Sequence, residues 1–183
     1  MSNRQYDPLW RGLHWGMALI VVALLVAIEV KGYLPKGPAK NLLMDAHKQL
    51  GVLVFLLFWW RLTWRVTHRA PPITPTPSRL MTGLSHGAHA LLYAAMLFIP
   101  VLGILFQQAR GNAVYFLGWT LPWILNDDSA LQYAKTLKEL HETLGNAAIW
   151  LIALHGAAAL YHHVVRRDDT LRRMAGSWVR SLP

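Results

Sequence analysis

Residues 138–165 read KELHETLGNAAIWLIALHGAAALYHHVV, and this stretch decides how the chain is built. It is predominantly apolar and longer than the roughly 20 residues with which a helix crosses a bilayer core. It also carries histidines, among them His141, His155 and His162. Because an ionisable group inside a bilayer is costly, such residues indicate a functional site. The stretch therefore predicts a membrane helix that carries functional histidines.

Three more stretches are long and apolar enough to span a membrane, at about 9–30, 42–66 and 82–107. The composition agrees, because 54% of the 183 residues are hydrophobic and 15% are charged, whereas soluble domains carry about 25% charged residues. Pro100 lies inside the third stretch and is expected to kink it. The sequence predicts an all-α, integral membrane four-helix bundle that forms one domain over residues 1–183, with its last helix at about 138–165.

The composition also excludes several kinds of protein. The chain has no cysteine, which excludes disulfides, Cys-ligated zinc, iron–sulfur clusters and covalently attached c-type haem. Its net charge is +9. The basic residues nevertheless lie at the ends of the apolar stretches rather than on a soluble face, so we expect membrane lipid and no nucleic acid as a partner.

Charged residues predict which side of the membrane each link faces. Four spans place both termini and the link between the second and third helices on one side. That side carries Arg4, Arg11, Arg61, Arg65, Arg69, Arg79, Arg166, Arg167, Arg172, Arg173 and Arg180 against Asp7, Asp168 and Asp169. The other side is nearly balanced, with Lys31, Lys36, Lys40, Lys48, Arg110, Lys135 and Lys138 against Glu29, Asp45, Asp127, Asp128, Glu139 and Glu142. By the positive-inside rule, both termini are expected to be cytoplasmic.

The intramembrane histidines fall into two layers. The outer layer holds His47 and His141, and the inner layer, toward the cytoplasm, holds His14, His86, His89, His155 and His162. A six-coordinate haem needs two axial ligands from facing helices, and helix bundles can supply them in their cores. If an outer haem exists, its ligands must be His47 and His141.

The last helix connects the two layers. His141 and His155 are 14 residues apart, so they return to within about 40° of the same face and lie about 21 Å apart along the axis. One helix can thus offer a ligand to each of two stacked haems. The partner of His155 could be His14, His86 or His89, and depth favours His14. A small residue follows one turn after each of four histidines, His14, His47, His141 and His155. These residues are Ala18, Gly51, Gly145 and Ala159, and they leave room for a flat macrocycle.

Histidines in membrane helices can also serve without a haem. Any one of them could be a hydrogen-bonded packing residue, and the set could line a proton pathway or channel or bind a non-haem metal. Copper and zinc sites usually show closer ligand spacing and often include Cys or carboxylate ligands. The layered set therefore favours haem.

The sequence resembles the bacterial cytochrome b561 family, the di-haem membrane cytochromes that include superoxide oxidase. The likeness is carried by Leu13-His14-Trp15, Asn41 to His47, Met81 to His89, Arg110-Gly111-Asn112, His141 to Leu144, Leu154 to Ala159 and His162-His163. It implies a four-helix bundle in the bacterial inner membrane with two non-covalent haem b groups stacked across the bilayer. It also implies that His14 and His155 ligate the cytoplasmic haem, and His47 and His141 the periplasmic one.

The same resemblance implies an activity, in which superoxide gives an electron to the outer haem and ubiquinone is reduced near the inner haem. Superoxide is an anion that positive charge steers, so Lys138, Arg110 and Lys48 are the candidates near the outer haem. A quinone needs a proton donor, for which His162 is the first choice and His89 the second. The roles of His86 and His89 stay open, because both could also meet haem propionates.

A different function is also compatible with the sequence. The chain could be a haem-bearing membrane subunit or anchor that transfers electrons for a soluble dehydrogenase or hydrogenase, without superoxide activity. Its one-electron donor would then be that partner protein, docked on the basic cytoplasmic face.

Overall fold

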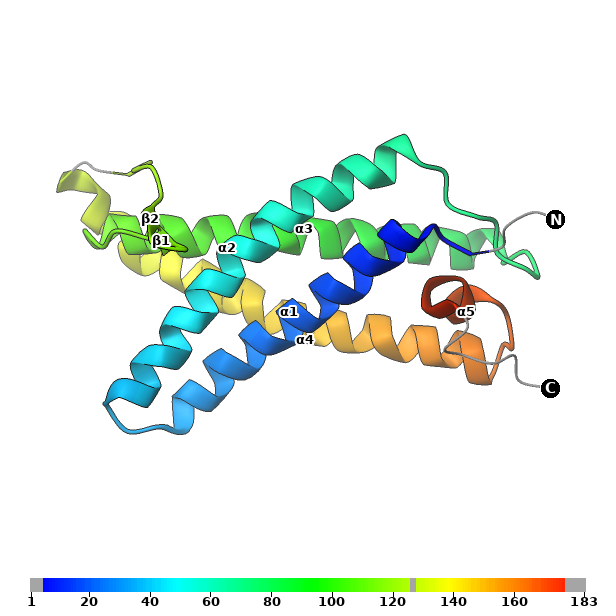
Figure 1. Ribbon diagram of the computed structural model, residues 1–183, viewed down its shortest axis with the longest axis horizontal. Coiled ribbons are helices and arrows are strands. Elements are labelled where there is room, and N and C mark those ends of the chain that lie inside the picture. Colours follow the sequence, from blue (N-terminus) through cyan, green and yellow to red (C-terminus); the bar gives the residue numbers. More distant parts are fainter. Residues whose placement is uncertain (1–4, 126–127, 177–183) are drawn as a thin grey trace.

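The protein is all-α in its main architecture, and the computed structural model describes residues 5–125 and 128–176 (Figure 1). Its elements in chain order are α1 (Pro8–Tyr33), α2 (Pro38–Thr67), α3 (Arg79–Ala109), β1 (Tyr115–Phe116), β2 (Trp119–Thr120), η1 (Asp128–Tyr133), α4 (Ala134–Val164) and α5 (Thr170–Ala175). The predicted membrane four-helix bundle is confirmed. Arg4, Asp127 and Arg180, as well as the side chain of Asp128, lie outside the described residues.

The long helices extend beyond the apolar stretches that predicted them. α2 begins at Pro38 rather than near residue 42, because a proline at the first helical position has the backbone angle that a helix requires. α4 begins at Ala134 rather than near residue 138. Polar residues next to a membrane span can stay helical, since the helix still satisfies their backbone groups. α3 continues through Pro100.

The four long helices form two antiparallel pairs. α1 packs mainly on α2, α3 packs mainly on α4, and α2 joins the pairs through α3 (Figure 1). Over the described residues, the backbone of α4 scarcely approaches α1 or α2. The space between α4 and the α1–α2 pair is therefore bridged by side chains.

One cluster of buried residues lies between the first three helices. Met17, Val54 and Phe58 are buried against one another, with Tyr93 and Met96 of α3 packed beside them. The outer surfaces are strongly apolar, and α4 exposes 73% of Trp150. All four long helices have the length and composition to cross a membrane. Such exposed apolar surface is what lipid chains would cover.

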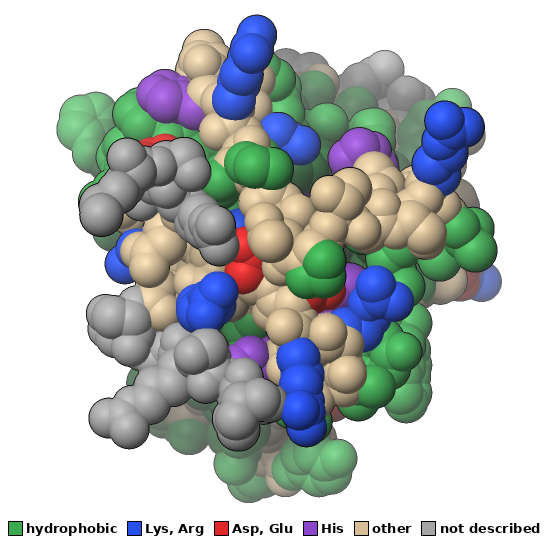
Figure 2. Space-filling model, turned by 90° about the vertical axis from the view of Figure 1, so that its right-hand side faces the viewer, with side chains coloured by type: hydrophobic (Ala, Val, Ile, Leu, Met, Phe, Trp, Pro, Cys, Tyr) green, Lys and Arg blue, Asp and Glu red, His purple; other side chains and the backbone are tan. Residues whose placement is uncertain are grey.

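The two ends of the bundle differ in structure. One end, which we call the terminal end, holds Tyr6, α5 and the link between α2 and α3; there the Tyr6 N–H donates to the Arg173 carbonyl at 3.2 Å. Basic side chains are spread over this face (Figure 2). The opposite loop end holds the 34–37 turn, η1 and a tight hairpin of β1 and β2.

Asp7 connects two helices at the terminal end. Its carboxylate accepts from the Trp10 N–H at 2.9 Å, which caps α1, and from the Trp64 indole of α2 at 3.0 Å. Burial raises the pKa of Asp7, but these two hydrogen bonds help to outweigh it, and the pKa lies below its ordinary value. The ionised form is thus the one that the fold stabilises.

Replacing Asp7 with alanine is expected to lower the free energy of unfolding by about 1 kcal/mol, the usual cost of a lost N-cap. Asp7→Asn keeps a capping oxygen, so its free energy of unfolding should lie between those of the wild type and Asp7→Ala. The measurement is unfolding in detergent at several pH values. Because the folded pKa is lowered, the stabilisation is present above the unfolded pKa of about 3.9 and shrinks as the pH falls through the folded value. Equal stability of wild type and Asp7→Ala at pH 7 would contradict this role.

Candidate functional site

Two histidines face each other at the loop end. The rings of His47 on α2 and His141 on α4 have centroids 6.2 Å apart and are nearly perpendicular, at 88°. Nδ1 of His47 lies 3.1 Å from the Leu24 carbonyl, and Nδ1 of His141 lies 2.9 Å from the Ile99 carbonyl. A carbonyl only accepts, so each Nδ1 carries the proton and each Nε2 keeps a free lone pair. This is the tautomer that a metal-binding histidine requires.

The spacing of this pair suits one metal ion between the rings. A metal–imidazole bond is about 2 Å long, so two rings that bind one ion from opposite sides have centroids about 6 Å apart. The observed value of 6.2 Å matches. Two imidazoles in this arrangement could hold the iron of one haem.

A second pair at the inner layer repeats this spacing. His14 on α1 and His155 on α4 also have centroids 6.2 Å apart, with an interplanar angle of 72°. His89 on α3 approaches His155 more closely, with centroids 5.4 Å apart, which is short for two rings with an ion between them. The geometry therefore favours His14 over His89 as the partner of His155.

The remaining inner histidines are arranged differently. His89 is exposed, and its Nδ1 lies 2.6 Å from the Ser85 carbonyl one turn earlier on α3. His86 is exposed on the same helix. Among the described residues, no group of three or more His, Cys, Asp or Glu is arranged around a possible metal-ion site. A haem, which needs only two protein ligands, fits the facing pairs better than a bare metal ion does.

The bundle also leaves room for a flat group beside the histidines. A Cβ atom added at Gly51 or at Gly145, one turn after His47 and His141, would meet nothing within 4 Å. His141, Gly145, His155 and Ala159 recur at the spacing that the periodicity of a helix places on one face of α4. The residues present thus fit a haem at each layer.

Sequence reasoning missed Gly103 of α3. A Cβ added there would lie 3.0 Å from Cε1 of His141, so the ring would have to shift by a few tenths of an ångström to accommodate an alanine. The Phe106 ring of the same helix also contacts His141, with the two ring centroids 5.7 Å apart. A glycine inside an apolar stretch indicates close packing, but the sequence does not say against what.

The candidate steering residues all lie toward the loop end. Lys138 is exposed and pairs with Glu142 of the next turn at 2.7 Å, so its charge is partly compensated. Lys48 is half-buried beside His47, and Arg110 is exposed at the C-terminus of α3. The β1–β2 hairpin is attached to α2 near these residues, since the Leu117 N–H donates to the Gln49 side chain at 3.1 Å.

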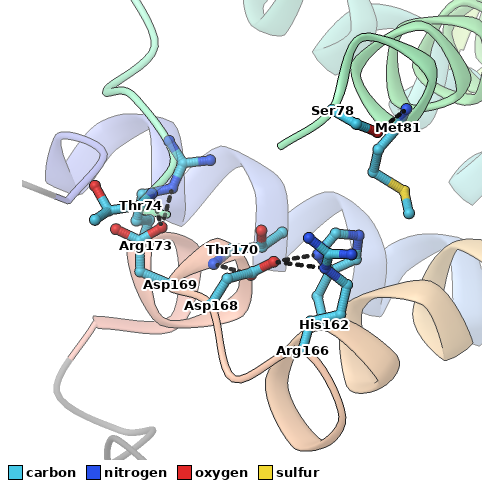
Figure 3. A network of polar contacts seen from close by, with 9 residues as sticks. All are labelled: Thr74, Ser78, Met81, His162, Arg166, Asp168, Asp169, Thr170 and Arg173. Carbon is cyan, nitrogen blue, oxygen red and sulfur yellow. Dashed lines mark hydrogen bonds and ion pairs between the residues drawn. The ribbon is translucent and has the colours of Figure 1, made fainter. Parts of the chain in front are cut away.

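His162 lies at the terminal end in contact with a buried carboxylate. Its Nδ1 is 2.5 Å from Oδ2 of Asp168, whose side chain is 2% exposed, and Arg166 is 3.9 Å from the same oxygen (Figure 3). Burial raises the pKa of Asp168, but hydrogen bonds from Thr170 and His162 outweigh it, and the pKa lies below its ordinary value. The carboxylate is thus held ionised in direct contact with the His162 ring.

The sequence predicts for Asp168 only a place among the charged residues at the membrane surface. Its neighbour Asp169 accepts from the Thr74 N–H at 2.9 Å and lies 3.6 Å from the Arg173 guanidinium, which fastens the start of α5 to the α2–α3 link (Figure 3). This fastening holds Asp168 against His162. Two aspartates after a helix end give no sequence signal for such a contact.

Comparison with known proteins identifies relatives over nearly the whole chain. A family model described as prokaryotic cytochrome b561 matches residues 5–177. The chain is 32% identical to the probable superoxide oxidase CybB of Yersinia pestis, over 94% of this chain and 96% of that protein. It is 34% identical to cytochrome b561 homolog 1 of Escherichia coli strain K12, over 88% and 92% of the two chains. Homolog 2 of the same bacterium is 29% identical, over 96% and 93%.

Gly103→Ala is expected to displace the His141 ring and to weaken haem retention at the loop end about 10-fold. This is the lower end of the range seen when a group that supports a metal ligand is changed. The measurement is haem bound per protein after washing, together with the reduced-minus-oxidised spectrum. Gly83→Ala is the matched control, because it makes the same change in α3 where an added Cβ meets nothing within 4 Å. If both variants bind haem like the wild type, Gly103 does not support His141.

Proposed function

The chain belongs to the prokaryotic cytochrome b561 family of membrane electron-transfer proteins, and we propose that it holds one haem b between His47 and His141 and a second between His14 and His155. The observation that carries this proposal is the equal spacing of 6.2 Å in both pairs. Both pairs draw on α4 at positions 14 residues apart, which separates the two haems by about 21 Å along the helix axis. Haem, when bound, supplies one-electron chemistry.

We further propose that the protein is a superoxide oxidase that passes electrons to ubiquinone. Two superoxide anions each give up one electron and leave as dioxygen, and the quinone takes both electrons and two protons to become a quinol. The likeness to the probable superoxide oxidase CybB supports this reaction. Lys48 and Arg110 at the loop end, and Lys138 where its pairing with Glu142 allows, would attract the anion.

His162 is the proposed proton donor to the quinone at the terminal end. Imidazole titrates near neutral pH and can therefore both give and regain a proton during turnover. The ionised Asp168, 2.5 Å from Nδ1, keeps the His162 ring oriented. His89, exposed on α3 near His155, is the second candidate for the quinone.

The terminal end is proposed to face the cytoplasm of a bacterium, with the protein as a multi-pass component of the inner membrane. Support comes from the basic side chains around that end (Figure 2) and from the positive-inside rule. The same surface favours a second candidate function. A soluble dehydrogenase or hydrogenase could dock there and exchange electrons with the inner haem, without any superoxide activity.

Alanine variants of the four ligands test the haem proposal. His47→Ala and His141→Ala should each remove the same one of two haems, and His14→Ala and His155→Ala should each remove the other. The measurement is haem content per protein combined with redox-titrated absorption spectra. The control is His86→Ala, which changes an exposed histidine of the inner layer. Loss of the inner haem in His89→Ala but not in His14→Ala would reverse the inner assignment.

Purified protein with generated superoxide and ubiquinone tests the activity. The wild type is expected to consume superoxide and form quinol. His162→Ala should slow quinol formation about 100-fold, as typical for a lost general acid, and Asp168→Asn about 10-fold, while superoxide still reduces haem in both. His163→Ala is the control, because that ring points about 100° away around the helix. A wild type that neither consumes superoxide nor shows haem reduction by it would leave the electron-transfer subunit as the function.

A further inference from the structure

Arg61 of α2 occupies the position that corresponds to a haem ligand on α4. It follows His47 by 14 residues, as His155 follows His141. That spacing returns a helix to within about 40° of the same face, about 21 Å further along. At the inner layer, α4 therefore offers a histidine and α2 an arginine.

The contacts of Arg61 place it at the inner pair. Its Nη2 lies 3.0 Å from Nδ1 of His14, and its Nε donates to the Tyr93 hydroxyl of α3 at 3.4 Å. The guanidinium carbon also lies 5.9 Å from the centroid of the Tyr93 ring. Arg61 is half-buried, and within the described part of the chain no carboxylate forms an ion pair with it. A charge within an apolar span is costly, so an anionic partner is expected.

The bond between Arg61 and His14 is incompatible with iron binding by His14. A guanidinium has only donors, so Nδ1 of His14 must accept and the ring proton must sit on Nε2. A histidine that binds iron through Nε2 carries its proton on Nδ1 instead, as His47 and His141 do toward their carbonyl partners. When His14 becomes a ligand, Arg61 therefore loses this acceptor and must find another.

We propose that Arg61 binds a propionate carboxylate of the haem held by His14 and His155, and thereby raises the reduction potential of that haem. A guanidinium pairs with a carboxylate through parallel hydrogen bonds, which makes arginine well suited to this task. Tyr93 holds the side chain at the level of the inner pair. The positive charge stabilises the reduced haem, which carries one more electron than the oxidised form. The inference rests on the proposed inner ligand pair.

Redox titration of each haem tests this role through a readout other than activity. Arg61→Gln is expected to lower the inner potential by about 59 mV, a tenfold change for one electron, and to leave the outer potential unchanged. Arg61→Lys keeps the positive charge, so the inner potential should fall by less in this variant. Arg65→Gln is the matched control, because this arginine lies one turn further along α2, is exposed, and packs its guanidinium 5.8 Å from the centroid of the Trp10 ring. An inner potential that is unchanged in Arg61→Gln overturns the proposal.

Apoprotein reconstituted with the dimethyl ester of haem b, whose propionates carry no charge, completes a double-mutant cycle. The difference between wild type and Arg61→Gln is expected to vanish with this haem. A difference that survives esterification overturns the proposal, because Arg61 would then act on something other than a propionate. If Arg61→Gln fails to retain the inner haem, the cycle is run with Arg61→Lys and with Tyr93→Phe. Failure of the ligand assignment is distinguishable, since His14→Ala would then retain both haems.

Discussion

Two contacts between facing imidazole rings, one at each layer of the bundle, are the interaction on which the rest of this structure depends. They bridge α4 to α2 at His47–His141 and to α1 at His14–His155, both with centroids 6.2 Å apart. Elsewhere α4 packs on α3 and scarcely approaches the α1–α2 pair. An iron between each pair of rings would join the two halves of the bundle, so the cofactor is expected to be part of the fold as well as of its chemistry.

The outer and inner pairs differ in what surrounds their Nδ1 atoms. Backbone carbonyls of Leu24 and Ile99 already set the ligand tautomer of His47 and His141. Nδ1 of His14 instead faces the Arg61 guanidinium. A histidine that binds iron through Nε2 carries its proton on Nδ1, so it cannot accept a hydrogen bond there. The outer pair is therefore already arranged as a metal site would require, whereas the proposed inner site would have to exchange one contact to take up a haem. In the proposed inner site, Arg61 would then be available to bind a carboxylate of the cofactor.

The terminal end shows how a short helix can support a functional residue. α5 has only 6 residues and would not persist alone. The Thr74 N–H donates to Asp169 and Arg173 donates to the Pro71 carbonyl, which fastens α5 to the link between α2 and α3. An ion pair joins Asp169 to Arg173. As a result, Asp168 is held buried against His162. The polar network at the terminal end thus extends to His162, the proposed proton donor.

Apolar length and histidine spacing along one helix are local properties, so the sequence alone determined four spans, the shared face of His141 and His155, and the outer pair. Helix ends were less certain, because polar residues beside a span can stay helical, as at Ala134. Only the tertiary structure decided the contact of Gly103 with His141, the ring spacings of His14 and His89 from His155, the Asp168–His162 pair and the position of Arg61. Each depends on the distance between side chains of separate segments, and residue types along a chain do not specify how far apart packed helices stand.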